Sequence, residues 1–455
     1  MAAWRLGGVI RCCYQREQPD EVARQMRETK TCVVLMDRDT APVLRQAASS
    51  LGWPVTLLSV GREPVPDTMH YQQLVQYDLS AFPAESVRVN VHTDVAVITS
   101  TTGSTGRPKG VMLSHFNLVC GFFIAWSKTS RDTQIADTNV DNVSNLISVM
   151  KACCNGASVI LIPRHISKHD YLDVIMQYKP ASVMMYPAIA TWFARDAKVT
   201  QHDLSFVRTL VFIGNILNHT TLTLMDKLLP QCRFHQAYGI SECAFISNTA
   251  LDISSRLVKT TKNAGEIHAS IGLLLPFTEC KLVHLETEKT IVEPGERGEI
   301  LVRSPLLMLG YITPEGEADR SKIDAEGWYH TGDIGFFDQE DFLYVTGRVN
   351  FSYRKQGYDI MPGEIEAVLL THEGVMAAGV VGIPDAEALY LTRAYVVLLE
   401  DQHVTASELQ KYVAERMHVA KHLDGGVRFL PELPLNRNNK LDYKKLLEID
   451  KKSSR

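Results

Sequence analysis

The sequence predicts an α/β fold with parallel sheets, and two observations support this prediction. Apolar runs of strand length alternate with helical patterns through the first half of the chain. The runs are nearly continuous in apolar residues, which is typical of strands buried on both faces of a parallel sheet. A chain of 455 residues also exceeds the size of one ordinary hydrophobic core, so we expect at least two domains.

The elements of this first half follow one another in strand–helix order. Helical patterns separate the strands, for example at residues 20–29 and 169–178. Repeated alternation of this kind is typical of strand–helix–strand units with parallel pairing. The expected strands cover residues 31–37, 95–100, 158–163, 181–187 and 209–214.

The pattern of the sequence changes near residue 265, where the alternation of strands and helices ends. Short strand-like runs follow, with turn signals at Pro294-Gly295 and Arg297-Gly298, and they predict an antiparallel or β-barrel-like segment. We expect a further boundary near Gly347. Beyond it, four runs read as helix, strand, strand and helix, which together form a small α+β unit of ordinary domain size. These runs cover residues 364–372, 376–385, 392–400 and 406–417.

The composition argues against several classes of function. The apolar fraction of 45% and the charged fraction of 22% are typical of a soluble globular protein. The net charge of −5 gives no electrostatic reason to expect nucleic acid or an anionic membrane as a partner. The nine cysteines include no CxxC pair, and their odd number and irregular spacing fit reduced thiols. We therefore expect an intracellular, cytoplasmic protein.

Neither end of the chain carries a clear targeting signal. The apolar run 118–126 is shorter than the roughly 20 residues that a spanning helix needs, so we expect no integral membrane segment. The arginine-containing start at residues 1–16 has the composition of a mitochondrial presequence, but we prefer a helix end followed by a strand. The last three residues, Ser-Ser-Arg, are a poor match to the peroxisomal Ser-Lys-Leu signal.

A loop rich in glycine and hydroxyl groups follows the expected strand 95–100. Its sequence, TTGSTGRPKG at residues 101–110, is expected to lead into a helix. Backbone N–H groups, hydroxyls and a helix N-terminus all favour an anion, and Lys109 adds a full positive charge, so the loop suits phosphate. It is not the P-loop of nucleoside triphosphatases, because Pro108 and Gly110 flank the lysine where that motif requires Gly-Lys-Ser/Thr.

The full string at residues 101–110 resembles the signature loop of the adenylate-forming (AMP-binding) superfamily. This superfamily includes acyl-CoA synthetases, 4-coumarate–CoA ligases and beetle luciferases. Further family-like stretches follow in the family's order and spacing, so the resemblance extends from about residue 5 to the end. These stretches are QAYGISE (236–242), GWYHTGD (327–333), TGRVNFSYRKQGYDIMPGEIE (346–366) and PLNRNNKLDYKKL (434–446).

The resemblance implies a domain plan. It predicts a large AMP-binding N-terminal domain over residues 1–346, a hinge at 347–351 and a small mobile C-terminal lid domain over 352–455. The chain begins in what resembles the middle of a family helix, so about a hundred residues of a full-length relative would be missing. We therefore expect an exposed apolar face where such a segment would pack.

The resemblance also implies a role for the motif residues. Tyr238 would stack on adenine, and Asp333 would accept hydrogen bonds from both ribose hydroxyls. Arg348 would contact ribose or phosphate. The expected ATP- and AMP-binding residues are Thr101, Thr102, Gly103, Ser104, Thr105, Gly106, Lys109, Gly214, Ala237, Tyr238, Gly239, Ser241, Asp333, Val345 and Arg348.

The reaction of the family has two steps. A carboxylate oxygen attacks the α-phosphorus of ATP and expels pyrophosphate, and the thiol of coenzyme A then attacks the acyl-adenylate. Fixed cations and magnesium stabilise the developing charge. Lys440, Lys109 and Glu242 are the expected catalytic residues, and Glu242 would also bind Mg²⁺. Gln356 and Gly357 would line the coenzyme A tunnel, where glycine permits close approach of the backbone.

We therefore expect an acid–thiol ligase similar to acyl-CoA synthetases. Its substrate would be a small-molecule fatty or aryl carboxylate, and ATP, Mg²⁺ and coenzyme A would take part in the reaction. The sequence predicts neither which acid is used nor the oligomeric state.

Several positions depart from the family pattern and leave two alternatives open. Residues 135–150 lack the family's histidine patch, the hinge acid or lysine is Asn350, and the glycine before the last lysine is Asn439. Arg354 stands where luciferase-like enzymes carry a lysine. One alternative is a degenerate relative that binds nucleotide without ligase chemistry. The other is luciferase-like oxygenation, against which Arg354 argues, because arginine and lysine are not interchangeable at such sites.

Overall fold

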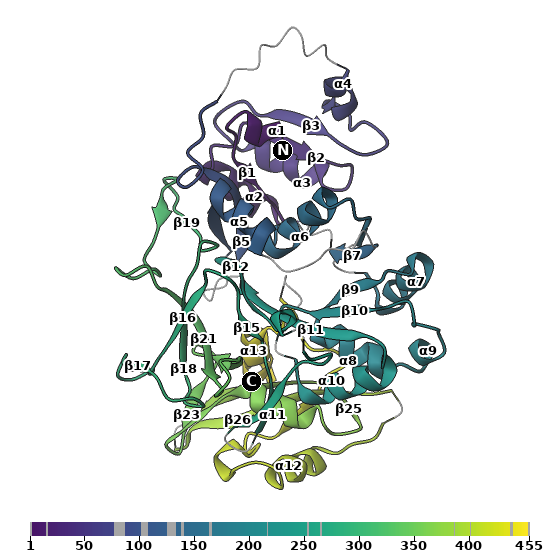
Figure 1. The fold of residues 1–455 in the computed structure, drawn as a ribbon, viewed down its shortest axis with the longest axis vertical. Helices are drawn as coiled ribbons and strands as arrows, with labels where there is room; N and C mark the ends of the chain where they lie inside the picture. Colours follow the sequence, from purple (N-terminus) through teal and green to yellow (C-terminus); the bar gives the residue numbers. More distant parts are fainter. Residues whose placement is uncertain are drawn as a thin grey trace.

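In the computed structural model the first part of the chain and most of the C-terminal region lie at opposite ends of the molecule. Figure 1 shows residues 2–76 at one end and most of the region 352–453 at the other, with the sheets of residues 95–348 between them, while the last helix, α13 (Tyr443–Ser453), lies nearer the middle. The structure describes residues 2–14, 17–76, 87–101, 108–124, 133–137, 141–162, 166–215, 217–252, 254–263, 266–385, 387–400, 402–436 and 440–453.

A seven-stranded sheet with the order β15-β12-β11-β10-β9-β7-β8 forms the centre of the molecule. Its strands are β7 (Gln134–Asp137), β8 (Val159–Ile162), β9 (Ser182–Met185), β10 (Thr209–Phe212), β11 (Arg233–Ile240), β12 (Cys243–Asn248) and β15 (Leu273–Leu274). The pairings among β8, β7, β9, β10 and β11 are parallel, and those of β12 and β15 are antiparallel. This confirms the predicted strands at 158–163, 181–187 and 209–214.

Helices connect the parallel strands, as the alternation predicts. They are α6 (Val143–Cys154), α7 (Lys168–Tyr178), α8 (Pro187–Arg195), α9 (Ala197–Thr200) and α10 (His219–Leu228). Polar side chains stabilise their first turns: Ser167 accepts a hydrogen bond from the Asp170 N–H, and Asn218 accepts one from the Thr221 N–H. The apolar faces of α7, α8 and α10 pack with the sheet in one core.

A second sheet has the order β1-β5-β6-β19-β20 and corrects one expectation. It contains β1 (Ile10–Arg11), β5 (Val95–Thr101), β6 (Lys109–Ser114), β19 (Gly310–Ile312) and β20 (Ala318–Asp319). The glycine-rich loop does not lead into a helix: β6 follows it, pairs antiparallel with β5, and places Lys109 opposite Thr101. The apolar run after the loop is therefore a strand, and α5 (His115–Ile124) begins only at its far end. No helix N-terminus follows the loop directly.

The first part of the chain folds around a small parallel sheet. It contains α1 (Ala2–Arg5), α2 (Pro19–Glu28), α3 (Ala41–Ser49), α4 (Tyr71–Val75), and the strands β2 (Val33–Met36), β3 (Thr56–Ser59) and β4 (Met69–His70). Val34 and Met36 of β2 are buried with α2 and α3. Val33 and Leu35 point the other way and are 50% and 59% exposed. An apolar face is thus exposed in this part, while what packs against it stays a prediction.

Residues 260–348 form antiparallel strands, as expected, in an open sheet rather than a closed barrel within the described part of the chain. The sheet order is β17-β16-β18-β21-β22. Its members are β16 (Glu279–Val283), β17 (Thr290–Ile291), β18 (Gly298–Arg303), β21 (Tyr329–Phe337) and β22 (Leu343–Arg348), and a separate hairpin consists of β13 (Thr260–Asn263) and β14 (Glu266–Ala269).

The C-terminal region, residues 352–453, confirms the predicted helix, strand, strand and helix. Its elements are β23 (Tyr353–Lys355), β24 (Tyr358–Ile360), α11 (Pro362–Leu369), β25 (Val375–Asp385), β26 (Leu389–Leu398), α12 (Ala406–Ala414), the 3-10 turn η3 (Val419–Lys421), β27 (Val427–Phe429) and α13 (Tyr443–Ser453). Arginines join this region to the rest: Arg297 pairs with the buried Glu364, and Arg195 donates to the Leu370 carbonyl at 3.0 Å.

The apolar run 118–126 belongs to α5 as far as residue 124. Among the helices that the structure describes, none combines the length and the apolar character required to cross a membrane.

Candidate active site

Three of the predicted nucleotide-binding residues meet through hydrogen bonds. Asp333 on β21 and Arg348 on β22 are direct cross-strand partners, and Nε of Arg348 lies 2.7 Å from Oδ1 of Asp333. Tyr238 on β11 donates its hydroxyl to Oδ2 of the same carboxylate at 2.7 Å. Asp333 is only 3% exposed. Strands from two sheets therefore fix both oxygens of one buried carboxylate.

The electrostatics of this group follow from its burial. Desolvation raises the pKa of Tyr238 well above its usual range, and the Asp333 carboxylate adds to the rise. The same carboxylate raises the pKa of Arg348, whose side chain remains half exposed. Tyr238 is therefore a neutral hydrogen-bond donor and Arg348 a permanent cation at this point.

Ser241 and Glu242 form the tight turn between β11 and β12, in which Ile240 pairs with Cys243. The motif is thus a hairpin rather than a turn into a helix. Gly239 is required there, because a Cβ at this position would lie 2.0 Å from the Ala244 carbonyl oxygen. Glu242, at the tip, is 8% exposed. The hairpin brings this carboxylate towards the end of β6.

Lys109 and Glu242 approach each other through an aromatic side chain. Nζ of Lys109 lies 4.9 Å from the centre of the Tyr311 ring, within the range of a cation–π contact. The hydroxyl of Tyr311 donates to Oε1 of Glu242 at 2.6 Å. The structure thus brings the predicted phosphate-binding lysine and the predicted metal-binding carboxylate to the same tyrosine.

The other predicted nucleotide-binding residues lie on or next to strands of the same sheets, where the structure describes them. Thr101 ends β5, Ala237 lies on β11 and Val345 lies buried on β22. Gly214 follows β10 with φ +82°, and a Cβ there would lie 2.6 Å from the Tyr186 ring. Thr102, Gly103, Ser104, Thr105 and Gly106 lie outside the described residues.

Gln236 gives independent support for a polar ligand between β10 and β11. Its Nε2 lies 3.5 Å from the Asn215 carbonyl oxygen, just after Gly214. The side chain is 2% exposed, and Oε1 has no hydrogen-bond partner among the described residues. Because buried acceptors are nearly always satisfied, a ligand with a donor group fits this place.

Gln356 and Gly357 form the turn between β23 and β24. Both have positive φ, +52° and +83°, which is the geometry of a two-residue hairpin and explains the glycine. Both residues are exposed, and a Cβ on Gly357 would meet open space. Their place in a coenzyme A tunnel stays a prediction.

Lys440 is described, but the three residues before it are not. Its backbone N–H donates to Oδ1 of Asn436 at 3.2 Å, and it lies three residues before Tyr443 at the start of α13. The Tyr443 ring stacks on Phe351 at 4.5 Å between centres. Burial, with the Glu366 carboxylate adding to it, raises the pKa of Tyr443 well above its usual range, and the nearby Arg348 charge acts in the opposite direction. The chain after Lys440 therefore lies beside the site. The contact of Lys440 with phosphate stays a prediction.

Sequence reasoning missed several residues that the structure brings to the site. Tyr329 lies in the family-like stretch 327–333, and neither it nor Tyr311 was assigned a role from the sequence. Arg24 on α2 donates to the Pro108 carbonyl at 3.1 Å and so holds the residue before Lys109. A signal for Arg24 existed in its spacing from Glu21 and Glu28, which pair with it on one helix face.

The donors present fit a magnesium ion that arrives with a nucleotide. Mg²⁺ in such sites takes one or two carboxylates and completes its shell with phosphate oxygens and water. Glu242 offers one buried carboxylate held by neutral hydroxyls. Within the described residues there is no cluster of three or more metal-binding side chains, so no all-protein metal cage is found there.

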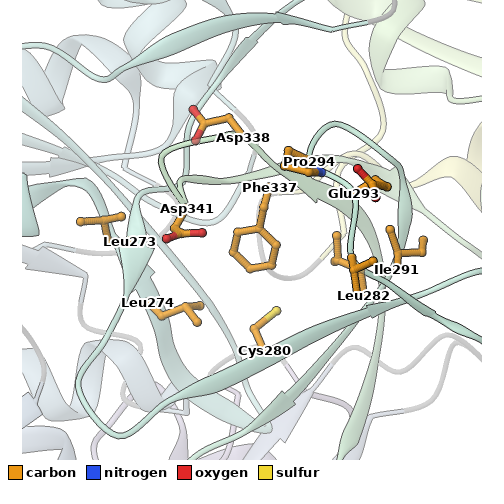
Figure 2. A pocket seen from close by; sticks show the side chains of 11 residues that line it. Leu273, Leu274, Cys280, Leu282, Ile291, Glu293, Pro294, Phe337, Asp338 and Asp341 are labelled. Carbon is orange, nitrogen blue, oxygen red and sulfur yellow. The ribbon is translucent and has the colours of Figure 1, made fainter.

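A separate cavity of about 440 Å³ lies between β15, β16, β17 and the end of β21. Figure 2 shows Phe337 at its centre, with Leu273 and Leu274 on one side and Asp338 and Asp341 at its rim. None of the predicted site residues lines it, so it is distinct from the group around Asp333.

Known proteins resemble this chain in sequence over most of its length. Over 374 residues the chain is 31% identical to luciferin 4-monooxygenase of Nipponoluciola cruciata, with 81% of this chain and 66% of that protein covered. It is 25% identical over 449 residues to a 4-coumarate–CoA ligase of Humulus lupulus, with 97% and 80% covered. The chain thus spans just under two thirds of the luciferase.

Solved structures show the same fold. The structure of ATP-bound MatB from Rhodopseudomonas palustris matches with a TM-score of 0.83 at 21% identity, and the match covers 99% of this chain and 85% of that one. The sequence model of the AMP-binding enzyme family matches residues 1–312, and that of its C-terminal domain matches residues 364–440. These matches cover well over half of the chain, which therefore belongs to the AMP-binding enzyme family, the adenylate-forming superfamily.

Proposed function

We propose that this protein activates a carboxylic acid with ATP to an acyl-adenylate and then transfers the acyl group to coenzyme A. The observation that carries the proposal is the convergence of Tyr238, Asp333 and Arg348 on one side and Lys109 and Glu242 on the other. A hydroxyl-binding carboxylate beside a permanent cation suits a ribose and its phosphate, and a lysine near a buried carboxylate suits phosphates with a divalent cation.

The chain's own residues would divide the first step between them. Lys109 and Arg348 would bind phosphate oxygens, and Tyr238 and Asp333 would fix the nucleoside. Lys440 would approach the α-phosphate and stabilise the charge that develops there. Magnesium, held by Glu242 and the phosphates, supplies further charge neutralisation when it is bound.

The second step would use the exposed hairpin turn at Gln356 and Gly357. Glycine at a turn without nearby atoms leaves room for the pantetheine arm of coenzyme A. The substrate would be a fatty or aryl carboxylic acid, as in the related ligases. Pocket shape changes selectivity by only about 1–3 kcal/mol per methylene group, so the acid must be found by assay.

The test is pyrophosphate release with magnesium and ATP across a panel of fatty and aryl acids, each with and without coenzyme A. Release stimulated by one acid, with formation of its thioester, is the expected result. Glu242→Gln should abolish release, while the exposed control Glu315→Gln should leave it unchanged. Silence across the panel together with measurable ATP binding would favour a nucleotide-binding relative without ligase chemistry.

Luciferase-like oxygenation is a second candidate because luciferases are among the relatives at 31% identity. Arg354 in place of the luciferase lysine argues against it, since it pairs with Glu286 as an exposed ion pair. Oxygen uptake and light emission with luciferin and ATP would identify this activity.

A further inference from the structure

Two tyrosine hydroxyls meet where three sheets come together. Tyr311 lies on β19, in the sheet that contains β6, and Tyr329 begins β21 in the open antiparallel sheet. Glu242 lies in the β11–β12 turn of the seven-stranded sheet. The segment between these sheets is also tied by its backbone, because the Met308 N–H donates to the Glu242 carbonyl at 2.8 Å.

The contacts among these side chains are short and shielded from water. The hydroxyl of Tyr311 lies 2.6 Å from Oε1 of Glu242 and 2.9 Å from the hydroxyl of Tyr329. The exposed fractions are 7% for Tyr311, 4% for Tyr329 and 8% for Glu242. A distance of 2.6 Å is typical of a hydroxyl donating to an ionised carboxylate, which is among the stronger hydrogen bonds in proteins.

The choice of donor matters for the charge of the site. The hydroxyls of Tyr311 and Tyr329 are phenol groups, which are neutral hydrogen-bond donors around pH 7. Neutral hydroxyls orient a carboxylate without cancelling its charge. Lys109 approaches Glu242 through the Tyr311 ring, and the carboxylate charge remains available to a cation that binds together with phosphate.

We propose that Tyr311 and Tyr329 are positioning residues that hold the Glu242 carboxylate for the divalent cation accompanying ATP. The ring of Tyr311 also holds Lys109, whose Nζ lies 4.9 Å from its centre, so one side chain orients both phosphate-directed groups. This inference rests on the proposed function, because it assumes that Mg²⁺–ATP binds beside Glu242.

The experiment measures ATP binding by calorimetry, with excess Mg²⁺ and with EDTA. The ratio of the two affinities is the gain due to the metal. Tyr311→Phe keeps the ring and removes the hydroxyl, so we expect this gain to fall about tenfold while affinity in EDTA stays unchanged. Tyr329→Phe should give a smaller loss of the same kind. Tyr311→Leu should in addition weaken binding in EDTA, because Lys109 loses its ring.

The matched control is Tyr344→Phe. This tyrosine is fully buried on β22, and its hydroxyl donates to Asp338 at 3.0 Å, away from the site. Tyr344→Phe removes a buried hydroxyl, as Tyr311→Phe does, but it should leave the ratio of the ATP affinities with Mg²⁺ and with EDTA unchanged. An unaltered gain in Tyr311→Phe and Tyr329→Phe would overturn the inference. Absence of ATP binding by the unmodified protein would instead overturn the proposed function itself.

If Tyr311→Phe fails to fold, Tyr329→Phe carries the same test, because its hydroxyl contacts Tyr311 rather than any backbone group in the described structure. An equal loss in Tyr344→Phe would show that any missing hydroxyl has the effect, and would likewise overturn the inference.

Discussion

The two regions that carry the predicted site residues are built differently. On the sheet side, strand register fixes the side chains: Asp333 faces Arg348 across a β ladder, and Glu242 sits in a two-residue turn. In the C-terminal region the predicted residues lie in turns and short segments, with Gly357 at an exposed hairpin tip and Lys440 just before α13.

The difference indicates a division of labour. Side chains held by ladders and burial are pre-organised, which suits binding, where every group that must be ordered weakens affinity. Side chains at exposed turns can change their surroundings when the region that carries them moves, which suits steps that occur one after the other. Four predictions test this comparison.

The largest effects on activity and ATP affinity should come from two separate substitutions, one in the C-terminal region and one in the sheets. Lys440→Ala should lower the rate of adenylation about 10²–10³-fold, or about 3–4 kcal/mol in the barrier, and leave ATP affinity within about threefold. Asp333→Asn should instead weaken ATP binding about tenfold or more, because Arg348 and Tyr238 lose a charged acceptor. Pyrophosphate release and calorimetry measure the two quantities.

The control for this pair is Lys451→Ala, which removes the same charge from the exposed end of α13. If Lys440→Ala weakened ATP binding as much as it slowed turnover, the proposed division between binding and catalysis would be wrong.

Gly239 and Gly357 should differ in what an added methyl group does to stability. Gly239→Ala would place a Cβ 2.0 Å from the Ala244 carbonyl, so the β11–β12 hairpin must shift, at a cost of about 2–3 kcal/mol. Gly357→Ala meets no atoms and costs only the left-handed conformation, about 1 kcal/mol. Thermal unfolding of the two variants measures both. Equal losses of stability would mean that the β11–β12 hairpin accommodates a methyl group as readily as the β23–β24 turn.

The pH dependence of stability should have opposite signs on the two sides. Burial lowers the pKa of His235 on β11 to about 4, so the stability of the neutral form is present above the unfolded value near 6.5 and is lost as pH falls towards 4. Burial raises the pKa of Glu366 on α11 to about 7, so its contribution is present below about 4.5 and is lost as pH rises through 7.

The His235 term should amount to about 3 kcal/mol, because this side chain is buried and one pKa unit is worth about 1.4 kcal/mol. The Glu366 term should be smaller, about 2 kcal/mol, because this side chain is partly exposed and solvent screens it. The unfolding free energies of His235→Asn and Glu366→Gln should be measured from pH 4 to 8. The His235 variant should lose the rise of stability with increasing pH, and the Glu366 variant should lose the fall of stability with increasing pH. Parallel profiles for both variants and the unmodified protein would contradict the two assignments.

Local patterns predicted the elements of the fold well where they were long and periodic. The strands around 183 and 211 and the helix at 169–178 needed only apolar runs and their spacing. The prediction of a helix directly after the glycine-rich loop was wrong, because a short apolar stretch fits a strand or a helix equally well. Pairing with β5 makes this stretch a strand. Tertiary pairing is not encoded in local periodicity.

The site shows the same limit. Motif resemblance identified Asp333, Arg348, Tyr238 and Glu242 one by one, but not that the first two are cross-strand partners. Tyr311 was overlooked because its partners come from three sheets far apart in the sequence. Residues that carry a motif can be found from sequence, whereas residues that orient them are found from geometry.

The smallest effect is expected where the two sides touch at the surface. Arg354 of β23 pairs with Glu286 in the turn after β16, and both side chains are about 60% exposed. Exposed pairs of this kind contribute about 0–1 kcal/mol, so Glu286→Gln should shift the unfolding midpoint very little, and 1 M NaCl should remove even that difference. The pair nevertheless joins the hairpin of Gly357 to the sheets.

The same variant also tests whether this contact affects turnover. If Glu286→Gln raised the rate of thioester formation without changing that of adenylation, the contact would restrain the C-terminal region between the two steps. Its effect on the rate would then exceed what its small effect on stability suggests. If both rates stayed unchanged, the pair would be only a solvated surface contact, and the restraint on that region would come from buried contacts such as Arg297 with Glu364 and Arg195 with the Leu370 carbonyl.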